Sequence, residues 1–225
     1  MLNNENGTSV ASDPDAFYSS FQDSNRATTQ LIVETFMSTR RDNKAILHVA
    51  DVCSGIGIRG IQYCRSNSHV HVTSIDISYQ NCKLIEKNFS NNFINSSRYT
   101  VICADGIREL EKIENKDRFD IIDVDPFGSA TSMIIPCLHS VADGGLICLT
   151  YSDANALFGS RKADTFSHYG IHLRPTKGVI LNIQWLFLLI VLLIFRKKGT
   201  WYEGCFNAFP SRSLPLRGSR YKTLS

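Results

Sequence analysis

The chain has 225 residues, of which 43% are apolar and 20% charged, and its formal net charge is +3. This length and composition can bury one full hydrophobic core, which excludes a short peptide and a disordered chain. The seven cysteines are odd in number and none lies in a C-x-x-C pair, so we expect a reducing compartment, no disulfide framework and no metal site.

Strand-like apolar runs alternate along the chain with segments of helical periodicity. This β-α alternation predicts an α/β fold with a parallel sheet and right-handed crossovers. A turn at Asp143-Gly144-Gly145 is expected before the fifth strand. Strands are predicted near 46–52, 70–75, 99–103, 119–124 and 145–150, and helices near 22–38, 56–65, 78–91, 106–114 and 131–141.

The first predicted strand leads into a glycine-rich turn that ends at Arg59-Gly60. Gly55 permits the tight turn, Gly57 allows a ligand to approach the backbone, and Gly60 lets the next helix pack closely on the strand. The spacing also fits the dinucleotide pattern G-x-G-x-x-G, so the turn alone does not identify the cofactor.

Acidic residues stand at or near the ends of the first three strands. Asp76 is placed to accept the two hydroxyls of a ribose, which NAD and S-adenosylmethionine (SAM) share. Asp51 lies within reach of the amino-acid end of a methionine-like cofactor, and Asp105 can accept a hydrogen bond from an adenine amine. Helix N-terminal amides usually bind a pyrophosphate, whereas three carboxylates suit a cationic sulfonium. The pattern therefore favours SAM over NAD.

The segment Asp123–Gly128 lies at the carboxyl end of the fourth strand, where an open α/β sheet binds its ligands. The Asp125 carboxylate, fixed by Pro126 and followed by the ring of Phe127, suits a planar heterocycle that carries an exocyclic amine. The ring stacks on the base, and the carboxylate positions the amine and accepts its proton. An ordinary strand-end turn has similar residues, so this alternative stays open on the motif alone.

Together these motifs resemble the tRNA guanine N2-dimethyltransferases, which make N2,N2-dimethylguanosine at tRNA position 26. The resemblance spans residues 17 to about 175, roughly the catalytic half of a family member. It implies a Rossmann-like class I SAM-dependent methyltransferase with a parallel-rich sheet flanked by helices, and tRNA as the substrate. The stretches that carry it are Phe17-Tyr18, Asn25-Arg26, Ser54–Gly60, Ile122–Ser129, Gly145–Asp153 and Tyr169-Gly170.

The resemblance also implies roles for single residues. Asp125 becomes the catalytic carboxylate, with Pro126 beside it, and Phe17 and Phe127 become the rings that stack the flipped guanine. The SAM site is assigned to Arg26, Arg59, Asp76, Asp105 and Gly106. From its position alone, in the first turn of an amphipathic helix, Arg26 would be a solvated side chain.

Two positions depart from the family pattern. Ser19-Ser20 replaces the usual Asn-Pro pair in the N-terminal loop, and Gly106 stands where alanine is common. Two other functions remain open: a non-catalytic SAM-binding or regulatory fragment, and an amino-methyltransferase that acts on DNA or protein. The Phe127-Gly128-Ser129 form disfavours the second of these.

Charge divides the chain into two parts. Residues 1–170 carry 15 Lys/Arg and 20 Asp/Glu, whereas residues 171–225 carry 9 and 1. An acidic catalytic half binds tRNA poorly, because phosphate contacts dominate affinity. We expect the sheet to lack its usual last strands and the chain to lack the family's C-terminal tRNA-binding domain. The expected division is a flexible N-terminus (1–16), an incomplete catalytic domain (17–178), an apolar segment (179–195) and a basic, disordered tail (196–225).

The apolar segment 179–195 has three interpretations. Its seventeen residues with a basic end suit a short membrane span, a buried terminal helix or strand, or an alternative terminus such as retained non-coding sequence. The abrupt change of charge and pattern favours the third. The first 16 residues are polar and lack arginine, which favours the nucleus or cytoplasm over the mitochondrion.

Overall fold

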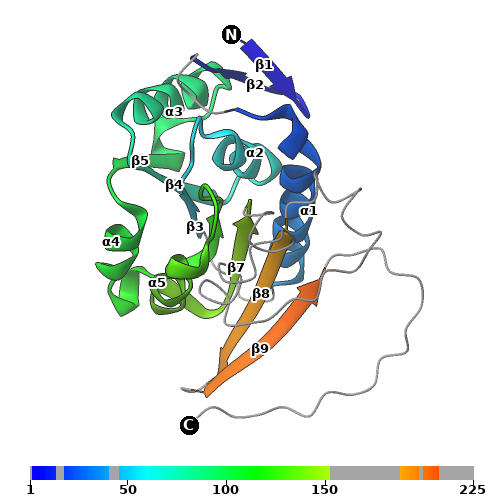
Figure 1. Ribbon diagram of the computed structural model, residues 1–225, viewed down its shortest axis with the longest axis vertical. Coiled ribbons are helices and arrows are strands. Elements are labelled where there is room, and N and C mark those ends of the chain that lie inside the picture. The colour runs from blue at the N-terminus through cyan, green and yellow to red at the C-terminus, as the bar shows by residue number, and fades with distance from the viewer. Residues whose placement is uncertain (1, 14–17, 41–45, 153–187, 198–199, 208–225) are drawn as a thin grey trace, which may run out of the picture.

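The computed structural model describes residues 2–13, 18–40, 46–152, 188–197 and 200–207 (Figure 1). Its centre is a seven-stranded sheet in the order β5-β4-β3-β6-β7-β8-β9, and a separate hairpin, β1-β2, lies at the N-terminal end. The strands are β1 Leu2–Glu5, β2 Thr8–Ala11, β3 Leu47–Val52, β4 Val70–Asp76, β5 Tyr99–Cys103, β6 Phe119–Val124, β7 Val141–Tyr151, β8 Leu188–Lys197 and β9 Thr200–Asn207. The α-helices are α1 Asp23–Thr39, α2 Ile58–Ser66, α3 Tyr79–Asn91, α4 Gly106–Glu111 and α5 Ile134–Ser140.

Five neighbouring strands, β5-β4-β3-β6-β7, are parallel, so their carboxyl ends meet at one edge of the sheet. In the centre, Val49 of β3 pairs with Val72 of β4 on one side and with Ile121 of β6 on the other. The chain runs outward from β3 to β5 and then returns to β6, which creates a switch point between β3 and β6. Ligands bind at such points in open α/β sheets. The predicted α/β fold is confirmed, with the five predicted strands and five predicted helices near their expected positions.

The predicted turn at Asp143–Gly145 is instead an irregularity inside β7. Phe119 of β6 pairs with Val141, but Ile121 already pairs with Leu146, so the β7 chain bulges between these two pairs. Gly144 has a φ of +72°, which glycine adopts without strain. The glycines therefore allow a bulge within one long strand, where the sequence indicated a turn before a shorter one.

The core lies on both faces of the sheet, because successive strand residues point to opposite sides. Val49 packs in a cluster with Ile61 of α2 and Phe89 of α3. The next residue, Ala50, packs in a second cluster that includes Leu110 of α4. Helices α1–α3 therefore cover one face and α4 and α5 the other.

The N-terminal segment, expected to be flexible, contains the ordered hairpin β1-β2. Asn6 and Gly7 form its two-residue loop with φ values of +50° and +76°, the positive values that a type I′ turn requires. Val10 of β2 is fully buried. An Asn-Gly pair is a strong sequence signal for a two-residue hairpin loop, but no hairpin was predicted here.

Two asparagines of α3 bind the outer edge of β2. The Asn88 side chain accepts from the Ala11 amide at 2.7 Å and donates to the Ala11 carbonyl at 3.0 Å. One turn further along the helix, Asn92 accepts from the Ser9 amide at 3.1 Å and donates to the Ser9 carbonyl at 2.6 Å. The hairpin is thereby attached to the domain through its backbone.

The sheet also differs from expectation at its other edge. Strands β8 and β9 extend it antiparallel beyond β7, and Leu146 pairs with Leu193. Two strands therefore extend the sheet where we expected none: β8 begins in the apolar segment and pairs with the edge of β7. Strand β9 comes from the tail that we expected to be disordered and pairs with β8, so that expectation is wrong for Thr200–Asn207. The rest of the apolar segment, 179–187, lies outside the described residues. Among the described helices, none is both long and apolar enough to cross a membrane.

Candidate active site

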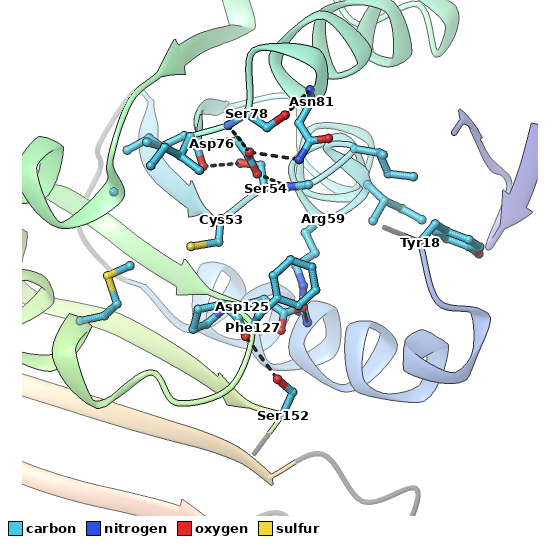
Figure 2. A pocket seen from close by; sticks show the side chains of 18 of the residues that line it. Tyr18, Cys53, Ser54, Arg59, Asp76, Ser78, Asn81, Asp125, Phe127 and Ser152 are labelled. Atoms are coloured by element: carbon cyan, nitrogen blue, oxygen red, sulfur yellow. Dashed lines mark hydrogen bonds and ion pairs between the residues drawn. The ribbon is translucent and has the colours of Figure 1, made fainter. Parts of the chain in front are cut away.

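A pocket of about 460 Å³ opens at the carboxyl ends of the parallel strands (Figure 2). Its walls come from four strand ends: Cys53–Ile56 after β3, Ile75–Ser78 at β4, Ala104–Ile107 after β5, and Asp125–Phe127 after β6. The lining also includes Tyr18, Ser19, Gln22 and Arg26 from the N-terminal part of the chain, Ile58, Arg59, Asn81 and Met133 from helical segments, and Ser152 after β7. The cavity therefore lies at the switch point between β3 and β6, where the strand order predicts a ligand site.

The glycine turn and Asp76 form one unit. The Gly55 amide, at a φ of +56°, donates to Oδ2 of Asp76 at 2.8 Å. Oδ1 of Asp76 accepts from the Ser78 amide at 2.9 Å and from Nδ2 of Asn81 at 3.1 Å (Figure 2). These donors fix the carboxylate at the pocket wall, where a ribose acceptor was predicted.

Asp105 lies in the loop after β5 and caps helix α4. Its Oδ1 accepts from the Ile107 and Arg108 amides at 2.9 and 3.3 Å, which satisfies two of the free donors at a helix N-terminus. Gly106 follows, and a Cβ there would lie 2.6 Å from Cγ1 of Val52. Both residues line the pocket, and their contact with the cofactor stays a prediction.

The other two glycines of the turn serve packing. Gly57 has a φ of +80°, and a Cβ on it would lie 3.1 Å from the Ile85 side chain. Its neighbours Ile56 and Ile58 line the pocket but Gly57 itself does not, and its approach to a ligand stays a prediction. Gly60 would place a Cβ 3.0 Å from Val72 and 3.1 Å from Phe89, which confirms its role in close packing.

Asp51 also lies away from the pocket. Its side chain is 1% exposed beneath the turn, where it accepts from the Gly60 amide at 3.2 Å. Burial, together with the nearby charge of Asp123, raises the pKa of Asp51 to about 7. The predicted contact with the amino-acid end of a cofactor is therefore not supported, because the carboxylate points into the protein interior.

Asp125 is bound by a buried arginine. Nη2 of Arg59 donates to Oδ2 of Asp125 at 2.9 Å and to Oδ1 of Asn25 at 2.7 Å, while Nη1 lies 3.3 Å from Oδ2 of Asp123. The Tyr63 hydroxyl donates to the same oxygen of Asp123. Asp125 keeps some exposure, with 19% of its side chain accessible. Figure 2 shows Arg59 and Asp125 together beneath the ring of Phe127.

Burial shifts the pKa values in this group. Desolvation raises the pKa of Asp123, against the lowering effect of Arg59 and the Tyr63 hydroxyl. Burial alone would lower the pKa of Arg59, but the charges of Asp123 and Asp125 raise it well above its ordinary value. Arg59 therefore stays charged between two carboxylates.

The loop that carries Phe127 is tied to the end of β7. The Gly128 amide donates to Oγ of Ser152 at 2.7 Å, and the Ser152 amide donates to the Gly128 carbonyl at 3.0 Å. The Ser152 hydroxyl also lies 3.4 Å from the Pro126 carbonyl. Phe127 is 79% exposed and lines the pocket, so its ring stands at the rim. Phe17, the other predicted stacking ring, lies outside the described residues.

Comparison with known proteins identifies the family. Residues 1–181 match the model of the N2,N2-dimethylguanosine tRNA methyltransferases. The chain belongs to this family. A tRNA (guanine(26)-N(2))-dimethyltransferase from Pyrobaculum islandicum is 32% identical over 161 residues, which cover 71% of this chain and 42% of that protein. One from Schizosaccharomyces pombe is 33% identical over 135 residues, 59% of this chain and 24% of that protein.

Solved structures agree on the fold. Trm1 from Pyrococcus horikoshii, solved with S-adenosyl-L-methionine, superposes with a TM-score of 0.68 at 21% identity, covering 78% of this chain and 49% of that one. The tRNA m1G37 methyltransferase of M. jannaschii gives a TM-score of 0.53 at 19% identity, covering 70% and 45%. The fold is thus the Rossmann-like class I methyltransferase fold. This family member spans less than half the length of the relatives that it matches.

Most of the predicted site residues gather at the pocket. Those that line it are Arg26, Gly55, Arg59, Asp76, Asp105, Gly106, Asp125, Pro126 and Phe127. Sequence reasoning missed Glu5, Tyr63, Asn81 and Ser152, which hold these residues in place. Ser152 lay inside a stretch already matched to the family, and the Asn6-Gly7 pair could have indicated the hairpin that carries Glu5. No sequence signal marked Tyr63 or Asn81.

Proposed function

We propose that this chain is a SAM-dependent methyltransferase domain that methylates the exocyclic N2 of a guanine in tRNA, at a position of the type of tRNA residue 26. One observation carries the proposal: the predicted acids Asp76, Asp105 and Asp125 all line one pocket at the switch point of the sheet. The relatives named as dimethyltransferases of tRNA guanine 26 support the substrate. The matched part of the chain covers 42% and 24% of those two relatives, so the proposal concerns the methyl-transfer step.

The donor set fits the cofactor. Three carboxylates suit a cationic sulfonium, and the apolar lining residues Ile56, Ile77 and Met133 suit an adenine ring. Asp76 would hold the ribose and Asp105 the adenine amine. When bound, SAM would supply an electrophilic methyl group, and breaking of its S–CH3 bond would leave neutral S-adenosylhomocysteine.

The chain's own residues then act on guanine. Phe127, exposed at the rim, would stack on the base after it leaves the tRNA stack, and such stacking is worth about 1–3 kcal/mol. Oδ1 of Asp125 would accept a hydrogen bond from the N2 amine, because Oδ2 is bound by Arg59. The carboxylate draws the nitrogen lone pair out of conjugation with the ring and takes the proton that N2 releases when it gains a methyl group. Positioning and general-base action of this kind contribute about 10²–10⁴-fold.

The test begins with calorimetric titration of the full chain with S-adenosylhomocysteine, using NAD as the control ligand. Micromolar binding of S-adenosylhomocysteine and no binding of NAD is the expected result. Methyl transfer to a tRNA with guanine at position 26 is then compared with the same tRNA carrying adenine there. We expect Asp125→Asn to lower this transfer at least about 100-fold. Cofactor binding without guanine-dependent transfer would contradict the enzymatic proposal and favour a non-catalytic SAM-binding fragment.

A further inference from the structure

The carboxylate of Glu5, at the end of β1, is the centre of a buried polar group beside the pocket. Glu5 is 5% exposed and accepts hydrogen bonds from three side chains that belong to three different segments. The Tyr18 hydroxyl donates to Oε2 at 3.1 Å, and Nε2 of Gln62 donates to Oε1 at 3.1 Å. Nε of Arg26 donates to both oxygens at 2.8 and 3.0 Å, and Nη2 donates to Oε2.

These contacts keep Glu5 charged. Burial alone would raise its pKa, but the hydrogen bonds and the charge of Arg26, with Gln62 and Tyr18, lower the pKa below its ordinary value. The ion pair with Arg26 is therefore present throughout the neutral pH range. It joins the N-terminal hairpin to α1 and to the wall of the pocket.

The same contacts fix the orientation of Arg26. Two of its nitrogens bind Glu5, Nη2 also donates to the Ser19 carbonyl at 2.9 Å, and the guanidinium lies 5.2 Å from the centre of the Tyr18 ring. Within the described residues, Nη1 has no hydrogen-bond partner. Tyr18, Ser19 and Arg26 all line the pocket, and Figure 2 shows Tyr18 at its edge, on the segment that precedes α1.

Arg26 is neutralised by fewer carboxylates than Arg59, the other arginine that lines the pocket. The described lining residues include two arginines, Arg26 and Arg59. Arg59 is bound by two carboxylates, Asp123 and Asp125, whereas Arg26 is bound by the single carboxylate of Glu5. An anionic group that enters the pocket is therefore attracted more strongly to Arg26.

We propose that Glu5 is a positioning residue for the amino-acid end of the cofactor: it holds Arg26 so that Nη1 is available to the cofactor's α-carboxylate. This inference rests on the proposed SAM-dependent function. It makes the N-terminal hairpin part of the cofactor site, although Glu5 itself does not line the pocket.

The test compares two ligands that differ in the amino-acid end. S-adenosylhomocysteine carries the α-carboxylate, and 5′-deoxy-5′-methylthioadenosine lacks the whole amino-acid group. Calorimetry on the full chain measures both dissociation constants for the wild type and for Glu5→Asp. That variant keeps the negative charge but withdraws it by one methylene. We expect about a tenfold loss of affinity for S-adenosylhomocysteine and a change below twofold for methylthioadenosine. The exposed Glu111→Gln is the control and leaves both constants unchanged.

Two further variants test the same effect. Glu5→Gln removes the charge, and Tyr18→Phe removes one donor to Glu5 while keeping the ring beneath Arg26. If Glu5→Asp does not fold, as judged by urea unfolding, Tyr18→Phe gives the decisive result: a smaller loss, again confined to S-adenosylhomocysteine.

Other outcomes overturn the inference. Equal losses for both ligands would show a purely structural role, and unchanged affinities would show that Arg26 needs no positioning. A gain in affinity for S-adenosylhomocysteine in Glu5→Gln would show that Glu5 competes with the cofactor carboxylate. Wild-type protein that binds neither ligand would overturn the proposed function as well, which separates the two failures.

Discussion

Nη2 of Arg59 donates to Oδ2 of Asp125 at 2.9 Å, so the arginine of the glycine turn is bound to the predicted catalytic carboxylate. The family pattern assigns Arg59 to the cofactor, and the residue does line the pocket. Its hydrogen bonds go to Asp123, Asp125 and Asn25. Residues two apart on a strand face the same side, which explains how one guanidinium reaches both carboxylates. Arg59 thus connects the turn after β3 with the end of β6.

Replacement of this arginine should strongly destabilise the fold. We expect Arg59→Met to lower the free energy of unfolding by about 3–5 kcal/mol, because it leaves buried carboxylates without their counter-charge. Urea unfolding measures this, with Arg65→Met, on the exposed end of the same helix, as the control that changes little. The double variant Arg59→Met/Asp123→Asn should recover part of the loss. A double variant as unstable as Arg59→Met alone would contradict this electrostatic explanation.

Asp51 should make stability depend on pH. Its native pKa of about 7 lies above the ordinary value of 3.8, so between these two values the native state binds the proton more tightly than the unfolded state. The free energy of unfolding therefore falls as pH rises from about 4 to about 7, by up to about 4 kcal/mol. Asp51→Asn should remove this contribution, while that of Asp123 remains, and be more stable than the wild type at pH 8.

The measurement for Asp51 is urea unfolding of both proteins across pH 4 to 8. The exposed Asp117→Asn is the matched control and should keep the wild-type dependence. Parallel curves for the wild type and Asp51→Asn would show that the proton is bound elsewhere.

Gly106 should not tolerate a methyl group while Val52 is present. A Cβ there would lie 2.6 Å from Cγ1 of Val52, a β-branched side chain with little freedom to move. We expect Gly106→Ala to cost about 1–3 kcal/mol in unfolding free energy. The same substitution in a Val52→Ala background should cost less, because the conflicting methyl is gone. Additive losses in a double-mutant cycle would refute this explanation of why glycine replaces the family's alanine.

Ser152 should affect catalysis more than cofactor binding. Ser152→Ala removes the hydroxyl that binds the Gly128 amide and the Pro126 carbonyl, and so loosens the loop that carries Asp125 and Phe127. We expect methyl transfer to slow by roughly 10–100-fold, since misplacement of about 1 Å costs that much. The dissociation constant of S-adenosylhomocysteine should stay within about twofold. Ser152→Thr keeps a hydroxyl and should retain more activity; equal loss in both variants would argue against this role.

The sequence predicted the parts of the fold that depend on local pattern. The strand ends at Asp76, Asp105 and Asp125 were predictable because each follows an apolar run, and parallel strands bring their carboxyl ends together. The residues that bind these acids and hold them in place were not predictable, because they lie far from their partners in the sequence. Tyr63 and Asp123 are 60 residues apart, and Gln62 and Glu5 are 57 apart.

Asp51 shows a second reason why the sequence did not predict every site residue correctly. Its position before the glycine turn is compatible with a pocket and with the interior, and only the packing of α2 on β3 decides between them. The Asn6-Gly7 turn was recognisable, but a single two-stranded hairpin is barely stable without support. Its support comes from α3, about 80 residues later, so the local pattern alone did not predict an ordered N-terminus.

The asparagines of α3 give that hairpin the equivalent of a third strand. Four helical residues rise about 6 Å. Two strand residues advance about 6.7 Å, so Asn88 and Asn92 match the spacing of Ala11 and Ser9. Each amide offers one acceptor and one donor, the pair that a neighbouring strand would present. The backbone groups of β2 on this side are thereby occupied, and they are closed to a strand from another molecule, the usual route by which exposed sheet edges aggregate.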